Sequence, residues 1–263
     1  MHQASYPMTM LNTLRSLLSH RPGIAYVLGD TLYLSPTVRS PAANTMRSCR
    51  GPSFESGIIA PLPASRTSQH TATASESGFE PLPAGADDPT AEELAALVDD
   101  FYAARTESLG SMGENDGGVV FQGNGDPLAA TNVVLETVRL VAERRNGIAF
   151  RLNTLGLCDT NDIDLLLSSG VVARGDVDQR RETRIATVSV FLPAANPNKY
   201  AELLQPNDGR GFSNACSFVA RLAEAGVDVE CTAVARPDIN VGEVKALAMS
   251  LGATSFRTRS WMG

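Results

Sequence analysis

Hydrophobic and polar positions alternate along the chain with two different periods. Short apolar runs typical of strands are followed by stretches in which apolar residues recur at i, i+4 and i+7, the spacing of one helix face. We expect strands at 119–121, 148–150, 171–173, 185–192, 227–234 and 254–258, and helices between 126 and 146 and at 162–169, 212–225 and 241–251. This rhythm predicts parallel strands with crossover helices, in a closed or partial β/α barrel of six or so units.

The N-terminal end of the chain has a distinct composition. Residues 1–22 contain no acidic residue and several Ser and Thr, which is typical of an organellar transit peptide and equally of a frayed N-terminal extension. We therefore expect one barrel domain over 23–263. It opens with two strands, 24–28 and 31–34, joined as a hairpin by a turn at Gly29.

Two loops are expected between this hairpin and the next ordered element. The second strand runs into an irregular loop, 35–53, and residues 55–89 are dominated by Ser, Thr, Ala, Pro and Gly without hydrophobic periodicity. The latter composition predicts a mobile surface loop inside the domain. A helix then begins at Thr90, which has a capping-box spacing to Glu93.

Composition and charge narrow the class of protein. The 263 residues are 43% hydrophobic, enough for a full-sized core, and a formal net charge of -7 leaves no basic surface for nucleic acid or an anionic membrane. No apolar run approaches the roughly 18 residues that span a bilayer. The four cysteines lie far apart, so no disulfide framework is expected. These features predict a soluble protein, cytoplasmic unless its N-terminus directs import into an organelle.

The candidate site lies where the predicted parallel strands end. One strand ends in the turn 123–126 (GNGD), whose glycines permit positive φ angles, and the next ends in Asn153 and Thr154. This carboxyl edge is where barrels build their sites. Asp126 either binds a ligand amine or caps its helix. Asn153 and Thr154 either face the barrel mouth or satisfy the backbone of a loop.

Two basic residues share one face of the last predicted strand. Arg257 and Arg259 are two positions apart, so they either bind an anion at the barrel or form ion pairs with acids such as Asp238. None of the three histidines lies at the end of a predicted strand. The sequence therefore predicts no catalytic residue.

The chain resembles the TatD-associated kind of radical S-adenosylmethionine (SAM) protein in several collinear motifs. These are LGDTLYLSPTVRS, FQGNGDPL, RLNTLG, TVSVFLPAANPNKY, QPNDGRGF and the closing segment from AGVDVECT to RTRSW. Every segment from Gly23 onward except the long loop has a counterpart in order. The resemblance implies a partial TIM-type (β/α)6 barrel of the radical SAM kind. It also implies SAM as a candidate ligand and a TatD-like metal-dependent hydrolase as a candidate partner.

The family's chemistry depends on three cysteines, spaced CxxxCxxC, that hold a four-iron four-sulfur cluster to which SAM binds. Here Ser40 stands at the first position, followed without gaps by Asn44 and Arg47, and two inserted residues would place the third position on Cys49. Hydroxyl, amide and guanidinium groups cannot replace thiolates on iron. The ordinary cluster is not expected to assemble, and Cys49 is the one candidate metal ligand of the motif.

The resemblance also assigns residues to the SAM pocket. The candidate cofactor-binding residues are Gly123, Asn124, Gly125, Asp126, Asn153, Thr154 and Ser189. Two neighbouring positions depart from the family pattern, because Asp126 stands where the family has Glu and Leu155 where it has Asn. The pocket is thus expected to keep its scaffold while its chemistry has changed.

Three functional hypotheses follow from these observations. The first is a degenerate member, a pseudoenzyme, that binds SAM, a related small molecule or a protein partner without radical chemistry. The alternative is an active radical SAM enzyme in which Cys49, with Cys158 or a non-cysteine ligand, holds an atypical cluster. The third is aldol or phosphate-ester chemistry in the same pocket, for which no positioned lysine or histidine argues.

Overall fold

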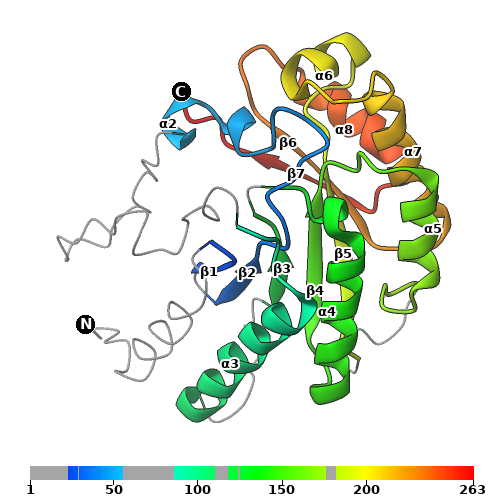
Figure 1. The fold of residues 1–263 in the computed structure, drawn as a ribbon. Helices are drawn as coiled ribbons and strands as arrows, with labels where there is room; N and C mark the ends of the chain where they lie inside the picture. Colours follow the sequence, from blue (N-terminus) through cyan, green and yellow to red (C-terminus); the bar gives the residue numbers. More distant parts are fainter. Residues whose placement is uncertain (1–22, 29, 56–85, 110–117, 124, 176–181) are drawn as a thin grey trace.

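A computed structural model describes residues 23–28, 30–55, 86–109, 118–123, 125–175 and 182–263 (Figure 1). The predicted N-terminal extension, most of the predicted surface loop and Asn124 lie outside these residues. What the sequence predicts for those segments stays a prediction.

The described strands form one curved sheet. They are β1 (Ala25–Leu28), β2 (Thr31–Leu34), β3 (Val119–Phe121), β4 (Ala149–Thr154), β5 (Arg184–Phe191), β6 (Val229–Val234) and β7 (Ser255–Arg259). Their order in the sheet follows the chain from β1 to β7, with β1 and β2 antiparallel and each later pair parallel. Because β1 and β7 lie at opposite ends of this order, the barrel of the described residues is partial.

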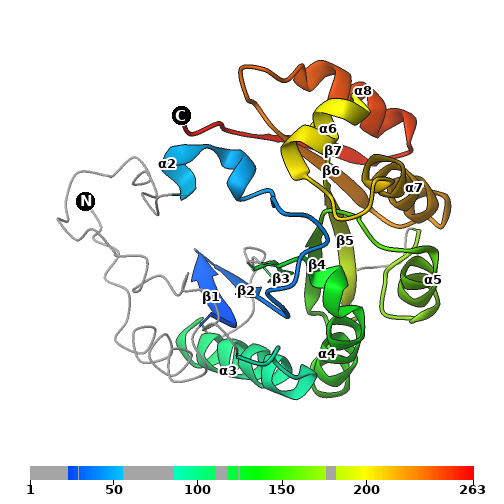
Figure 2. The ribbon, with the colours of Figure 1, turned by 45° about the horizontal axis from the view of Figure 1, so that its top comes forward.

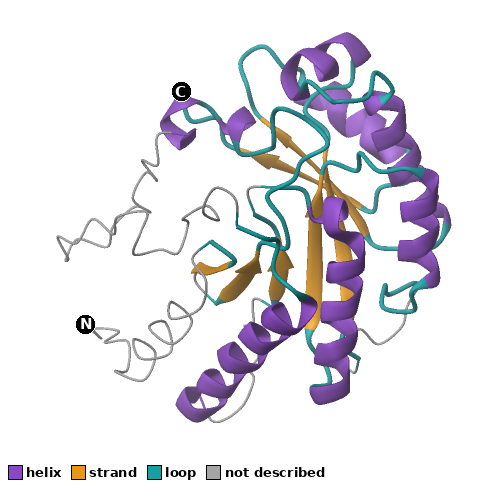
Figure 3. Ribbon diagram, in the orientation of Figure 1, coloured by secondary structure: helices purple, strands orange, loops and turns teal. Residues whose placement is uncertain are grey.

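Helices cover the convex side of the sheet, as Figures 1 and 3 show. The longer ones are α3 (Ala91–Leu109), α4 (Thr131–Arg144), α5 (Thr160–Ser168), α6 (Pro197–Leu204), α7 (Gly211–Glu224) and α8 (Val241–Ser250), and the short ones are η1 (Ser48–Arg50), α2 (Pro52–Glu55) and η2 (Pro127–Ala130). The core includes the buried rings of Tyr102, Phe121, Phe150, Tyr200 and Phe218. No helix in the described ranges is long and apolar enough to cross a membrane.

Most predicted elements are present close to their expected bounds, and three segments differ. Residues 171–173 contribute only an isolated bridge, between Val172 and Ile185. The pattern does not predict α6, whose start depends on its cap, because the side chain of Asn196 accepts from two backbone N–H groups of the first turn. The loop expected at 35–53 contains η1 and α2. The α/β barrel class is confirmed.

The two faces of the sheet carry different side chains. On β4, Leu152 is fully buried in the core, whereas its neighbours Arg151 and Asn153 are half-buried on the opposite, concave face. The strand register continues this polar face, because Asn153 lies beside Ser189 of β5 and Ser189 beside Glu230 of β6. With the top of the molecule turned forward, the strands β1 to β7 follow one another along an arc (Figure 2).

Candidate functional site

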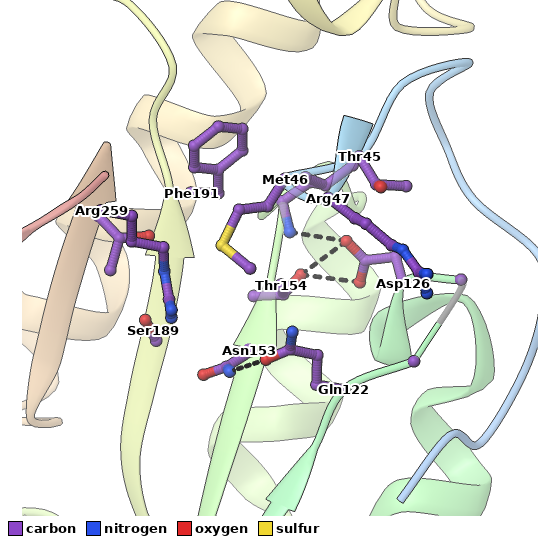
Figure 4. Close-up of a pocket in the computed structure, with 14 residues that line it drawn as sticks. Thr45, Met46, Arg47, Gln122, Asp126, Asn153, Thr154, Ser189, Phe191 and Arg259 are labelled. Carbon is purple, nitrogen blue, oxygen red and sulfur yellow. Dashed lines mark hydrogen bonds between the residues drawn. The ribbon is translucent and has the colours of Figure 1, made fainter. Parts of the chain in front are cut away.

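A pocket lies at the carboxyl end of the strands, on the concave side (Figure 4). Its described wall comes from the loop after β2 and from the ends of β3 to β7, with the residues Thr45, Met46, Arg47, Gln122, Gly123, Gly125, Asp126, Asn153, Thr154, Leu155, Ser189, Phe191, Thr232 and Arg259. Six of the seven residues that the resemblance assigns to a ligand site lie in this wall, and the seventh, Asn124, is outside the described residues.

Asp126 ties the turn after β3 to the end of β4. Its buried carboxylate accepts hydrogen bonds from the backbone N–H groups of Leu128 (2.9 Å) and Leu155 (2.6 Å) and from the hydroxyl of Thr154 (2.8 Å). Burial raises the pKa of Asp126, and the hydrogen bonds oppose this shift without cancelling it. Three donors use most of the accepting capacity of one carboxylate. Asp126 is therefore a helix cap and a strand tie, and its contact with a ligand amine stays a prediction.

The glycines of this turn make room for the loop that follows β2. A Cβ atom at Gly125 would lie 2.5 Å from the carbonyl oxygen of Arg39, and one at Gly123 would clash with the side chain of Ser35. The Asp126 N–H also donates to the Arg39 carbonyl, at 2.9 Å. Neither glycine has the positive φ angle that the sequence predicts. The close approach of two backbone segments explains both positions.

Polar side chains cross the concave face from β3 to β6. The Asn153 amide donates to the side-chain carbonyl of Gln122, and Arg151 Nε donates to Asn153 Oδ1 at 3.0 Å. Arg151 also pairs with Glu230. Asn153 thus faces the pocket and bonds to side chains, whereas Thr154 bonds to Asp126 and to the loop backbone. Both residues line the pocket, and Thr154 also satisfies the loop backbone.

Glu230 joins three strands on this face. Its carboxylate pairs with Arg151 of β4 and, at 2.9 Å, with Arg257 of β7, and it accepts a hydrogen bond from the Ser189 hydroxyl of β5 at 3.1 Å. The Glu230 side chain is only 13% exposed, so its pair with Arg151 is largely shielded from water, whereas the Arg257 side chain is 47% exposed. This carboxylate neutralises only one of the two guanidinium charges that it touches.

Arg257 is ion-paired, as one sequence hypothesis holds, but the suggested partner is wrong. The register of β6 and β7 brings Arg257 to Glu230. Asp238 pairs instead with Arg236 (3.0 Å) and Lys199 (2.8 Å), outside the sheet. The hydrogen bonds from Arg236 and Lys199 lower the pKa of Asp238.

Arg259 differs from the other arginines of this region. It lies in the pocket wall, and its Nε atom is buried without a hydrogen-bond partner in the described part of the chain. Burial, together with the charges of Arg257 and Arg50, lowers the pKa of Arg259 to about 10, although Glu230 opposes this shift. The positive charge of Arg259 is therefore poorly stabilised by the described residues.

Sequence reasoning missed several residues of the site. Gln122 directly follows the apolar strand β3, and Glu230 is a charged residue within the mainly apolar strand β6, a signal that could have placed both on the concave face. The pocket positions of residues 45–47, Phe191 and Thr232 depend on how the loop and the strand ends are arranged in space. No local motif encodes that arrangement.

The structure places Cys49 away from the pocket wall. Its side chain is buried, and its thiol contacts the carbonyl oxygen of Leu203 at 3.8 Å. The same carbonyl accepts the side-chain amide of Asn44 at 2.9 Å, and the Ser40 hydroxyl accepts from the backbone N–H of Ala42. Among the described residues, no three His, Cys, Asp or Glu side chains are grouped as a metal site. This donor set does not fit a cluster that needs three thiolates.

Cys158 is a poor source of a second thiolate. Burial raises the pKa of its thiol to about 12, and the nearby carboxylates of Asp162, Asp126 and Asp159 contribute. A thiol binds metal as the thiolate, so a high pKa opposes this role.

Comparisons with known proteins identify the fold. No protein-family model and no curated protein sequence matches the chain. The structure of Streptococcus suis SuiB bound to precursor peptide SuiA aligns with 99% of this chain and 46% of SuiB, with a TM-score of 0.54 and 10% identity. The structure of TYW1 with a lysine-pyruvate adduct bound aligns with 89% of this chain and 65% of TYW1, with a TM-score of 0.51 and 11% identity.

The chain spans less than two thirds of the length of these solved proteins. A further structure, of SuiB bound to S-adenosylmethionine, aligns with 68% of this chain at a TM-score of 0.47. At these identities the likeness concerns the fold alone. The described chain has a partial TIM-type α/β barrel, the fold that it shares with these structures.

Proposed function

We propose that this chain is a radical-SAM-fold protein that has lost the iron–sulfur cysteines and binds a small molecule, SAM or a related compound, without radical chemistry. The observation that carries the proposal is the content of the pocket wall. Thr45, Met46 and Arg47 occupy the side of the pocket formed by the loop after β2, and Cys49 of the same loop is buried against Leu203.

The pocket wall supports binding of a small molecule. Asn153 and Ser189 face it from adjacent strands and are held by hydrogen bonds to neighbouring side chains, so both are oriented before any ligand arrives. Met46, Leu155 and Phe191 supply apolar surface. A mainly apolar wall with a few fixed polar groups is the usual composition of a ligand site.

A protein partner is the second part of the proposal. One structural neighbour, SuiB, is described with a bound precursor peptide, which supports testing peptide binding by this barrel. The TatD-like hydrolase stays a prediction of the motif resemblance. The charge of -7 favours partners that are neutral or basic.

Equilibrium dialysis of the full chain with labelled SAM, after treatment with an iron chelator, tests the proposal. We expect saturable binding without iron and about fivefold weaker binding for Asn153→Ala, because one well-placed hydrogen bond contributes about 1 kcal/mol. Asn198→Ala is the matched control, since Asn198 is exposed on α6 and does not line the pocket. Binding that appears only after loading with iron would overturn the proposal, and the absence of binding under both conditions would exclude SAM.

A further inference from the structure

The concave face next to the β6–β7 side of the pocket carries more positive than negative charge. Arg151 and Arg257 share the single carboxylate of Glu230. Arg259 follows Arg257 by two residues on the same face of β7, and no ion pair within the described ranges includes it. Three guanidinium groups therefore approach one carboxylate.

This arrangement costs the protein stability unless something else binds there. The Nε atom of Arg259 is removed from water and has no hydrogen-bond partner in the described chain. A buried donor without an acceptor is unfavourable, more so when the group is charged. Arg257, Arg50 and Arg151 all disfavour the positive charge of Arg259, and Glu230 favours it.

The surroundings of Arg259 have the composition of a half-site for an acidic molecule. Arg259 lies in the pocket wall together with Ser189, and Figure 4 shows Met46 and Phe191 in the same cavity. A guanidinium group presents N–H donors in a planar fork that matches the two oxygens of a carboxylate or phosphate. The rings or aliphatic part of the same molecule would pack on Met46 and Phe191.

We propose that Arg259 binds an oxyanion, the carboxylate or phosphate group of an acidic small molecule, in this pocket. The inference rests on the proposed function, because it assumes that the pocket binds a small molecule. It adds the chemical class of that molecule and assigns the recognition to the last strand. Arg257 and Arg151 raise the local positive potential, while Glu230 holds them in place.

Isothermal titration with inorganic phosphate and with acetate, at constant ionic strength, tests the site on the full chain. We expect phosphate or acetate to bind the unmodified chain, and the affinity to fall about tenfold in Arg259→Gln, as for loss of one charge-assisted hydrogen bond. Preference for one probe identifies the anion as phosphate or carboxylate. Arg210→Gln is the control, because Arg210 is exposed and pairs with Asp208 outside the pocket.

Two further measurements complete the test: the probe affinity of Arg259→Lys and the unfolding temperature of Arg259→Gln. Arg259→Lys keeps the charge and loses the fork, so we expect its affinity to lie between those of the unmodified chain and Arg259→Gln. Without probe, Arg259→Gln should unfold at the same temperature as the unmodified chain or higher, because the buried Nε atom of Arg259 has no hydrogen bond to lose within the described residues. Equal probe affinity in Arg259→Gln and the unmodified chain, or no probe binding to either, would overturn the inference.

The probes contain neither adenosine nor iron, so the outcome is independent of the SAM experiment. Arg259-dependent phosphate or acetate binding without SAM binding would refute SAM as the ligand and keep the anion site. SAM binding that is equal in Arg259→Gln, with no probe binding, would keep the proposed function and refute the anion site.

Discussion

The two sides of the pocket differ in how their charged groups are satisfied. On the β3–β4 side, Asp126 accepts hydrogen bonds from Leu128, Thr154 and Leu155, all within the chain. On the β6–β7 side, Arg259 has a buried Nε without a partner among the described residues. A buried polar group whose hydrogen bonds are all made within the chain stabilises the fold. A buried polar group at a pocket without such a partner indicates a ligand. Substitutions on the first side should therefore reduce stability, and those at Arg259 should reduce binding.

Replacing Asp126 should give the largest loss of stability. Asp126→Ala leaves two backbone N–H groups and the Thr154 hydroxyl without their acceptor in a buried place, so we expect the free energy of unfolding to fall by about 3 kcal/mol. Urea unfolding measures it. Asp159→Ala is the matched control, because Asp159 caps α5 through a bond to Asp162 at an exposed position and should cost about 1 kcal/mol. Equal losses would show that Asp126 is an ordinary cap.

Filling the turn after β3 should also destabilise the protein. Gly125→Ala places a methyl group against the carbonyl of Arg39, which only a backbone movement can relieve, and we expect a loss of about 2 kcal/mol. Gly209→Ala adds the same methyl group where no atom lies within 4 Å. Its unfolding free energy should change by less than about 0.5 kcal/mol. A tolerated Gly125→Ala would contradict the role given to the loop after β2.

Replacing Glu230 by a neutral residue tests the charge balance near the β6–β7 side of the pocket. Glu230→Gln removes the one carboxylate that Arg151 and Arg257 share, so we expect unfolding to become easier by about 1 to 2 kcal/mol. Phosphate should offset part of this loss, because it supplies negative charge to the same arginines. Thermal unfolding with and without phosphate measures both effects. A loss that phosphate does not change would separate Glu230 from the anion site.

The ion pairs of Asp99, between α3 and the end of α4, do not involve the pocket, and their contribution to stability is the reference for substitutions on both of its sides. Asp99 of α3 accepts from Arg144 (2.9 Å) and Arg145 (2.7 Å) of the α4 end. Burial favours a higher pKa for Asp99, but the two arginines outweigh burial and lower it. A lowered folded-state pKa stabilises the protein above the unfolded pKa of about 4, and this stabilisation is lost as the pH falls through the folded value.

The predicted effect of Asp99→Asn is therefore small and depends on pH. We expect a loss of about 1 kcal/mol at pH 7, where Asp99 is ionised, and a difference that shrinks as the pH falls below about 4. Urea unfolding at several pH values measures it. A loss that is constant from pH 7 to pH 3 would mean that hydrogen bonding, and not charge, holds the α3–α4 contact.

The parts of the fold that local signals encode were predictable. The capping box of α3 forms as its spacing predicts, with Thr90 N–H donating to Glu93 (2.8 Å) and Glu93 N–H to Thr90 (3.2 Å). The hairpin of β1 and β2 also forms at its predicted position. Helix α6 was not predicted, although Asn196-Pro197 is a recognisable helix start.

The sequence predicts where the site lies, but not which of its charged side chains contact one another. The turn 123–126 and the end of β4 meet at one edge of the sheet because adjacent parallel strands end there, which the alternation of elements implies. The pairing of Glu230 with Arg151 and Arg257 depends on the register between three strands. Register is set by tertiary packing, which no single segment of the sequence specifies.

Iron counting shows whether the chain keeps the barrel and has lost the thiolates of the cluster. The full chain and Cys49→Ala are reconstituted anaerobically with iron and sulfide, and iron and visible absorption are measured. Because the loop that would hold the cluster presents Ser40, Asn44 and one buried thiol, we predict no stoichiometric iron in either chain. A stoichiometric cluster in the full chain that disappears in Cys49→Ala would contradict the account.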